Sequence, residues 1–300
     1  MDVLVVGGTG FVGQNLCREL DERDHDVTAL SRSPEAADLP DGVERVAGDV
    51  TDYGSIEAAF EGKDAVVFLP ALSPLFKPDG GNERHEQIHL GGTENCVRAA
   101  EEHGVGRYLQ MSALGADPNG ATHYLRAKGK AENVVKQSDL DWIIFRPSVI
   151  FGDGGEFVYF TKRLKQIFAP AVPVYPLPGG GRKAHFQLIW IDDLVPMLAD
   201  ALEDDDHVGQ TYEVGGPETL SLREATDLVY EGEGKSITIV PLPMPLAKVG
   251  LPVLGALGFP MGSDQYEGLD FDNTPSTNGV EAVGRPPSSL RTFGSYLGVE

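Results

Sequence analysis

Asp2-Val3-Leu4-Val5-Val6-Gly7-Gly8-Thr9-Gly10-Phe11-Val12-Gly13 opens the chain and decides how its first half folds. The apolar run before Gly7 is typical of a buried strand. The three spaced glycines predict a sharp turn into a helix: one permits the turn, one lets backbone approach a pyrophosphate, and one allows close helix–strand packing. Since a helix N-terminus offers free N–H groups to phosphates, the stretch predicts a dinucleotide site. The alternative is a glycine-rich turn without a ligand.

Short apolar runs alternate with helical patterns through the first half of the chain. The expected strands are Val3–Val6, Val27–Leu30, Val43–Val46, Ala65–Leu69, Arg107–Met111 and Trp142–Phe145. The expected helices lie near Val12–Arg23, Ser55–Phe60, Glu83–His103 and Thr122–Gln137. This order predicts an α/β fold, a Rossmann-type doubly wound parallel sheet with helices on both faces.

The second half is less regular, and we expect residues 151–300 to form a smaller C-terminal lobe beside an NAD(P)-binding domain of residues 1–150. Pro170 to Gly181 is rich in proline and glycine and predicts a loop. His185 to Ile191 predicts a strand leading into a helix. Thr211–Val214 and Ile237–Val240 predict further strands, and some of these elements are expected to return to the main sheet.

The residues after the second strand indicate which dinucleotide is bound. NAD enzymes usually place a carboxylate there for the ribose 2′-hydroxyl, whereas this chain has Ser31-Arg32-Ser33. Arg32 could make a forked contact with a 2′-phosphate, and the two serines add hydroxyl donors. We therefore expect NADP(H) to be favoured over NAD(H); the alternative is an ordinary surface arginine.

Asp49 and Val50 follow the third strand, where the carboxylate is placed to accept a hydrogen bond from the adenine amino group. Helix capping by Thr51 or Asp52 is the alternative use of this segment.

Tyr124 and Lys128 are four residues apart on an expected helix and so share one face. A lysine beside a phenol favours the phenolate and lowers its pKa, which suits a general acid/base for hydride chemistry at a carbonyl. Ser112 ends the fifth strand, where it would hold a substrate oxygen or the tyrosine hydroxyl. The alternative is a chance pairing, because a Tyr and a Lys often fall four apart on a helix.

The histidines and cysteines suggest no metal site. His85 and His89 share a helix face, but no cysteine or paired carboxylate completes a zinc set, so we interpret all the histidines as structural or surface residues. Cys17 and Cys96 lack metal or redox spacing and are expected to be buried in a reducing compartment.

The formal net charge of −22 would repel a phosphate backbone and argues against nucleic-acid binding. Aspartate-rich, lysine-poor composition resembles that of haloarchaeal proteins, although an ordinary solvated surface explains it too.

The chain begins with a strand and lacks a signal-peptide pattern, which predicts a cytoplasmic protein. The apolar segment Pro241 to Pro260 predicts a buried connection, with peripheral contact at the inner membrane face as the alternative.

Taken together, these motifs resemble the extended and atypical branch of the short-chain dehydrogenase/reductase superfamily, which includes NAD-dependent epimerases and dehydratases. Within it, the chain is most similar to the group of the 39 kDa accessory subunit of respiratory complex I. The matching stretches are Gly7–Gly13, Gly48–Val50, Met111–Gly115, Ala116, Tyr124–Lys128, Arg146–Gly152, Ile191–Leu194 and Ser263–Tyr266.

The resemblance implies that Leu69-Pro70-Ala71 lies along the cofactor and that Pro147, Ser148 and Val149 approach the nicotinamide. It also implies that Ser112, Tyr124 and Lys128 are catalytic, that Lys128 holds the nicotinamide ribose, and that Asp192-Asp193 caps a helix. The full set of expected cofactor-binding residues is Gly7, Thr9, Gly10, Phe11, Val12, Gly13, Ser31, Arg32, Ser33, Asp49, Val50, Leu69, Pro70, Ala71, Ser112, Tyr124, Lys128, Pro147, Ser148 and Val149.

Three functions remain open on these grounds. The first is an NADP(H)-dependent oxidoreductase or epimerase acting on a small molecule, favoured by the Ser112, Tyr124 and Lys128 set. The second is a non-catalytic NADPH-binding subunit or assembly module whose partners are respiratory-complex subunits, favoured by the subunit resemblance. The third is a nucleotide-sugar epimerase, for which Arg163, Arg182 and Lys183 could bind the diphosphate.

Overall fold

A computed structural model describes the chain except residues 170–171, 247, 249–262, 269–271 and 300. Its centre is a seven-stranded sheet, ordered β11-β6-β5-β4-β1-β2-β3, in which every pair is parallel. The strands are β1 (Asp2–Val6), β2 (Asp26–Ser31), β3 (Glu44–Ala47), β4 (Ala65–Phe68), β5 (Arg107–Met111), β6 (Asp141–Pro147) and β11 (Thr211–Val214). The predicted doubly wound Rossmann-type sheet is confirmed.

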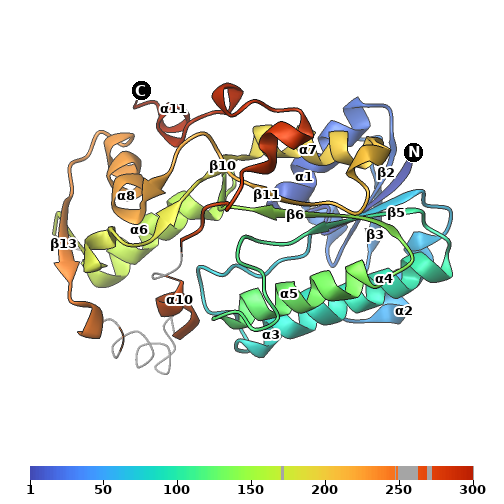
Figure 1. The fold of residues 1–300 in the computed structure, drawn as a ribbon, viewed down its shortest axis with the longest axis horizontal. Coiled ribbons are helices and arrows are strands. Elements are labelled where there is room, and N and C mark those ends of the chain that lie inside the picture. The colour runs from blue at the N-terminus through green and yellow to red at the C-terminus, as the bar shows by residue number, and fades with distance from the viewer. Residues whose placement is uncertain (170–171, 247, 249–262, 269–271, 300) are drawn as a thin grey trace.

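Helices cover both faces of this sheet (Figure 1). Alternate strand residues explain why, because Val3 and Val5 join one apolar core while Leu4 and Val6 join another. The helices around the sheet are α1 (Phe11–Glu22) and α7 (Ile191–Glu203) on the first core, and α2 (Tyr53–Ile56), α4 (Gly92–Glu102) and α5 (His123–Lys136) on the opposite side. Short 3₁₀ turns link them at η1 (Pro34–Ala36), η2 (Glu57–Phe60), η5 (Asp205–His207), η6 (Gly279–Val283) and η7 (Pro287–Ser289).

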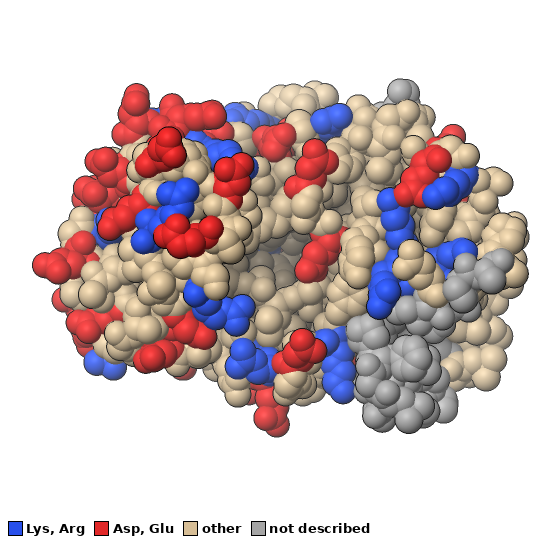
Figure 2. Space-filling model, turned by 180° about the vertical axis from the view of Figure 1, so that it is seen from behind, with Lys and Arg blue, Asp and Glu red and all other residues tan. Residues whose placement is uncertain are grey.

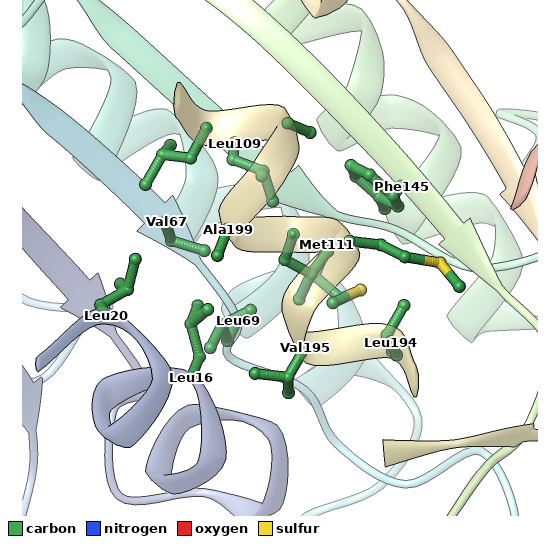
Figure 3. Close-up of a cluster of buried hydrophobic side chains, with 14 of the residues drawn as sticks. Leu16, Leu20, Val67, Leu69, Leu109, Met111, Phe145, Leu194, Val195 and Ala199 are labelled. Carbon is green, nitrogen blue, oxygen red and sulfur yellow. The ribbon is translucent and has the colours of Figure 1, made fainter. Parts of the chain in front are cut away.

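Helix α7 joins the second half of the chain to the first core (Figure 3). Its Leu194, Val195 and Ala199 meet Leu16 and Leu20 of α1 over the strands. All five of these side chains are buried. Because α7 completes this layer, residues beyond 150 are needed to cover the sheet. The division into residues 1–150 and 151–300 stays a prediction.

The glycine turn has the geometry that its sequence predicts. Gly7 adopts φ +82°, a left-handed conformation that favours glycine. A Cβ at Gly13 would overlap the carbonyl oxygen of Gly7 and the backbone of Gly8. Gly10 is the N-cap of α1, where no side chain caps the helix. The turn therefore brings α1 close to β1 and leaves its first N–H groups available.

The remaining elements build a lobe with its own apolar core. They are β7 (Ile150–Phe151), α6 (Glu156–Phe168), β8 (Val174–Pro178), η4 (Gly179–Gly181), β9 (His185–Phe186), β10 (Ile189–Trp190), β12 (Leu220–Ser221), α8 (Leu222–Glu231), β13 (Thr238–Leu242), α10 (Ser263–Glu267) and α11 (Phe293–Leu297). The expected strand His185 to Ile191 divides into β9 and β10, which pair with different partners.

The prediction that Pro170 to Gly181 is entirely loop was wrong. Within it, β8 pairs in parallel with β13. Tyr175 and Leu177 point inward and are buried, while Pro176 and Pro178 alternate with them. A two-stranded sheet consists only of edge strands, which tolerate proline because one side of each strand needs no ladder hydrogen bonds.

Two further expectations need correction. Asp192 and Asp193 lie in the first turn of α7 rather than capping it, and Asp193 accepts a hydrogen bond from the N–H of Arg291. In the segment Pro241 to Pro260, Leu246 is 63% exposed rather than buried, and residues 247 and 249–260 lie outside the described residues. The membrane contact there stays a prediction. No helix within the described ranges has the length and apolar character to cross a bilayer.

The structure also bears on the acidic composition and on the two cysteines. Acidic side chains are spread over the face shown in Figure 2, which is also hollowed near its centre. Cys17 and Cys96 are both free and buried, as predicted.

We predict that Gly13→Ala destabilises the fold by about 1–3 kcal/mol, because the added methyl group overlaps the turn backbone. Urea-induced unfolding followed by circular dichroism measures this loss. Gly106→Ala is the matched control, since a Cβ there would lie 3.7 Å from its nearest neighbour, the Asp64 carbonyl oxygen. Equal losses in the two variants would contradict the packing role.

Candidate functional site

A cavity of about 1040 Å³ lies at the carboxyl ends of the central strands, next to the lobe. This volume is at the upper end of the range for small-molecule sites, so the cavity has room for a dinucleotide together with a second molecule. All of the expected cofactor-binding residues, from Gly7 to Val149, line this one cavity. Their individual roles stay predictions, but the fold brings them together.

The glycine turn forms the floor of the cavity at β1. A Cβ placed on Gly10 would contact only the Gly7 carbonyl oxygen, at 3.3 Å, so the outer side of the turn is open. The N-terminus of α1 behind it has no side-chain cap, and its N–H groups remain available. An open turn backed by an uncapped helix fits a pyrophosphate.

The end of β2 carries polar groups that fit a phosphorylated ribose. The hydroxyl oxygen of Ser31 is buried and makes no hydrogen bond to the described part of the chain. Beside it Arg32 and Ser33 are exposed and line the cavity. A buried hydroxyl without a partner next to an exposed guanidinium is what a bound 2′-phosphate or ribose hydroxyl would satisfy.

Asp49 and Arg84 complete this half of the cavity. Asp49 already accepts hydrogen bonds from the N–H and hydroxyl of Thr51 at 2.9 and 2.8 Å. These bonds lower the pKa of Asp49, with Arg32 and Arg84 adding to the effect. Arg84 is the second residue of an interrupted helix that begins at Glu83, and it lines the cavity, so it is a second cation that the sequence did not identify. Only the fold shows that it approaches β2 and β3.

Lys128 lines the cavity and is 1% exposed. Its Nζ donates to the Met111 carbonyl at 2.7 Å. Burial lowers the pKa of Lys128 to about 7, although Glu132 opposes this. Burial raises the pKa of Tyr124, and Lys128 does not offset it. The expectation that Lys128 lowers the pKa of this phenol was therefore wrong for the protein alone: Nζ is directed to the Met111 carbonyl, and with a pKa of about 7 the amine is only partly charged at neutral pH.

Ser112 donates its hydroxyl proton to Glu132 Oε1 at 2.6 Å, not to Tyr124. Glu132 is 2% exposed and is also held by Arg146, at 2.8 and 2.6 Å. Burial would raise the pKa of Glu132, but hydrogen bonds from Arg146 and Ser112 outweigh it and lower the pKa. In this arrangement Ser112 can accept a hydrogen bond in the cavity but cannot donate one.

His85 and His89 lie against the ring of Tyr124, which sequence reasoning missed. Their ring centroids are 5.6 and 5.2 Å from that of Tyr124, both edge to face, and both imidazoles are buried. The expected helix Glu83–His103 is in fact α3 (Glu83–His85), a π-helical turn η3 (Glu86–Gly91) and α4, and this irregular segment places the pair. Burial lowers the pKa of His85 to about 4 and that of His89 also. Two neutral imidazoles therefore pack on the candidate catalytic phenol.

The lobe provides an apolar end to the cavity. Its aromatic and aliphatic lining is Leu75, Phe157, Phe160, Phe186 and Leu222. Three carboxyl side chains also line it: Glu156, Asp264 and Glu267. Asp264 accepts hydrogen bonds from the N–H of His123 at 2.8 Å and lies 3.1 Å from its ring Nδ1.

The three basic residues that could bind the diphosphate of a nucleotide sugar are not part of the cavity lining that the structure describes. They are Arg163, Arg182 and Lys183. Within the described ranges, no group of three or more His, Cys, Asp or Glu residues is arranged to hold a metal.

Comparisons with known proteins agree with the fold and with NAD(P)H binding. Residues 7–171 match the model of a family described as NAD(P)H-binding. The chain is 29% identical over 287 residues to a mitochondrial "NADH dehydrogenase [ubiquinone] 1 alpha subcomplex subunit 9" of Arabidopsis thaliana, covering 91% of this chain and 69% of that protein. It is 34% identical over 179 residues to a 2-alkyl-3-oxoalkanoate reductase of Stenotrophomonas maltophilia, covering 52% and 53% of the two chains.

Among solved structures, a nucleoside-diphosphate-sugar epimerase from Staphylococcus aureus superposes over 100% of both chains with a TM-score of 0.73 and 19% identity. At that identity the likeness concerns the fold alone.

We predict that Lys128→Met stabilises the protein most at low pH. Because the pKa of Lys128 is lowered in the folded state, the cost of burying its charge is fully present below pH 7 and disappears as pH rises toward the ordinary lysine value near 10. Urea-induced unfolding at pH 6 and pH 9 should show a gain in the free energy of unfolding that is larger at pH 6. Lys235→Met, at an exposed position, is the control. A Lys128→Met protein with the same stability difference from the parent at both pH values would contradict the buried-charge explanation.

Proposed function

Because the chain belongs to the NAD(P)H-binding family, we propose that it is an NADP(H)-dependent reductase that acts on the carbonyl group of an uncharged, largely apolar molecule. The observation that carries this proposal is the placement of Tyr124 and Lys128 in the same cavity as the glycine turn and Arg32. A proton donor and a dinucleotide site that share one cavity are the minimum that carbonyl reduction requires.

The cofactor preference rests on the end of β2. Arg32 and the Ser31 hydroxyl would hold the 2′-phosphate, and Arg84 adds a second positive charge on the same side. The turn at Gly7 to Gly13 would hold the pyrophosphate. When bound, NADPH supplies the hydride.

Tyr124 would supply the proton. Its raised pKa keeps the phenol protonated at neutral pH, and a protonated phenol is the form that reduction uses. Its hydroxyl makes no hydrogen bond to any of the described residues, so it is available to a carbonyl oxygen in the cavity. Lys128, with a pKa of about 7, can hold or release a proton near working pH and would bind the ribose in its charged form. The imidazoles of His85 and His89 fix the tyrosine ring by packing.

The substrate class follows from the apolar end of the cavity. Phe157, Phe160 and Phe186 offer aromatic surface, while Glu156 and Glu267 would repel an anionic substrate. One relative is named a 2-alkyl-3-oxoalkanoate reductase; the substrate in that name has the ketone and alkyl chain that the proposal requires, but also a carboxylate, which the substrate proposed here lacks. A nucleotide-sugar epimerase has less support, because the described lining of this end includes no arginine or lysine for the diphosphate.

A second candidate function is a cofactor-holding module in a respiratory assembly. The Arabidopsis relative, a subunit of an NADH dehydrogenase, matches 91% of this chain. The hydrogen bond from Ser112 to Glu132 also favours it, because that serine does not donate into the cavity. Assaying the purified protein for NADPH oxidation over a panel of apolar aldehydes, ketones and quinones separates the two. NADPH that copurifies and is oxidised by no member of the panel would overturn the reductase proposal.

We predict that Arg32→Ala weakens NADPH binding by about 1.5–3 kcal/mol and leaves NADH binding unchanged, because a charged hydrogen bond to the 2′-phosphate is lost. Fluorescence titrations at matched salt measure both affinities. Arg98→Ala removes an exposed arginine outside the cavity lining and is the control. If the parent binds both cofactors equally, the assignment of Arg32 is wrong.

We predict that Tyr124→Phe lowers turnover by about 10²- to 10⁴-fold with little change in NADPH affinity, since the ring and its packing remain and only the proton is lost. Single-turnover NADPH oxidation beside a binding titration measures both quantities. Tyr159→Phe, at a tyrosine that is 56% exposed, is the matched control. In the Tyr124→Phe protein, oxidation of NADPH at the parent's rate would exclude this phenol as the proton donor.

We predict that Gly10→Val gives a folded protein that no longer binds NADPH, because the new side chain projects from the open side of the turn.

A further inference from the structure

Asn273 lies where a late segment of the chain crosses the loop after β6. Its N–H donates to the His185 carbonyl at 2.7 Å, and its own carbonyl accepts from the Gln187 N–H at 3.2 Å. These bonds form a bridge alongside Phe186 of β9. The backbone of Asn273 is therefore fixed on both sides.

The side chain of Asn273 is fixed as well. Its Oδ1 accepts a hydrogen bond from the Val149 N–H at 3.0 Å and lies 2.8 Å from the Ser148 hydroxyl. A backbone N–H can only donate, so the end of the amide that faces Val149 must be the oxygen. The orientation of the amide follows without ambiguity, and Nδ2 points away from the loop.

The hydrogen-bond donors of the loop after β6, the Ser148 hydroxyl and the Val149 N–H, are already engaged by Asn273. The single proton of Ser148 Oγ is directed to Asn273, at 2.8 Å from both its backbone carbonyl and its Oδ1. The Val149 N–H is taken by Asn273, and the Val149 carbonyl accepts from Ile189 at 3.1 Å. Asn273 lines the cavity, yet its Nδ2 makes no hydrogen bond to any residue that the structure describes. Two N–H donors are thus available on this side.

The position in the sheet indicates which part of a dinucleotide these donors would meet. β6 lies on the opposite side of β1 from β2, where Arg32 follows the strand. A dinucleotide lies across the middle of such a sheet, with one nucleoside over each half. Since Arg32 belongs to the adenosine half, Asn273 lies with Tyr124 and Lys128 in the nicotinamide half.

We propose that Asn273 Nδ2 donates a hydrogen bond to the carbonyl oxygen of the nicotinamide carboxamide, an assignment that rests on the cofactor site proposed above. A primary amide offers two donors to an oxygen that accepts. Five hydrogen-bond contacts hold the rest of Asn273 in place, so little side-chain freedom is lost on binding. The contact would fix the rotation of the ring about its ribose bond and with it the face presented to the substrate.

Asn273→Asp tests this assignment directly. One carboxylate oxygen can still accept from Val149 and Ser148, while the other replaces the amide nitrogen and cannot donate. NADPH affinity should fall by about 10-fold or more, whereas the affinity for 2′,5′-ADP, which lacks the nicotinamide, should stay within twofold of the parent. Asn278→Asp makes the same change in the same segment, at a residue that is absent from the described cavity lining. Its Oδ1 accepts from the Gly215 N–H at 3.1 Å and its Nδ2 donates to the Gly215 carbonyl at 2.8 Å, so this variant controls for the loss of an amide donor within the fold.

A variant that binds NADPH as tightly as the parent would overturn the assignment. Should Asn273→Asp not fold, the parent protein still decides: the thionicotinamide analogue of NADPH carries sulfur, a poorer acceptor than oxygen, and should bind several-fold more weakly. Equal affinity for NADPH and its thio analogue would also overturn it. A parent protein that does not bind 2′,5′-ADP would instead overturn the cofactor site itself, which separates the two failures.

Discussion

The close approach of Gly13 to the backbone of Gly7 and Gly8 is the constraint on which the rest of the structure depends. It fixes the angle at which α1 leaves β1, and α1 in turn forms the surface on which α7 packs through Leu194 and Val195. Because α7 comes from the second half of the chain, its packing on α1 also holds that half against the sheet. The cavity lies between the turn and the lobe, so its shape follows from the same packing.

Burial favours the neutral forms of the titratable groups around Tyr124. Lys128, Tyr124 and the two histidines are all displaced from their ordinary pKa values in the direction that removes charge, since each is withdrawn from water. The fully paired charges, Glu132 and Arg146, lie behind Ser112. The negative charge of a bound cofactor would therefore raise the pKa of Lys128 and favour its ammonium form.

Local patterns were sufficient to predict the main sheet, the glycine turn and the residues around it, because short apolar runs and spaced glycines act within a few residues of one another. Predictions failed where the deciding partner was remote. Pro176 and Pro178 indicated a loop, but pairing with β13 made that stretch an edge strand. Ser112 matched a catalytic pattern, yet its proton goes to Glu132, twenty residues later. His85 and His89 were recognised as one helix face, but no local signal placed Tyr124 against them.

The link between Ser148 and Asn273 joins positions 125 residues apart in sequence. During synthesis at about 5–20 residues per second, the loop after β6 would leave the ribosome roughly 6–25 s before the residue that fixes it. Over about the first half of that interval the sheet could form without β11 (Thr211–Val214), and over the whole of it without Asn273, the partner of Ser148 and Val149. The nascent protein would then hold a nearly complete turn for phosphates before the opposite wall of the cavity exists, so that ligand capture and completion of the site are separate events in its biogenesis.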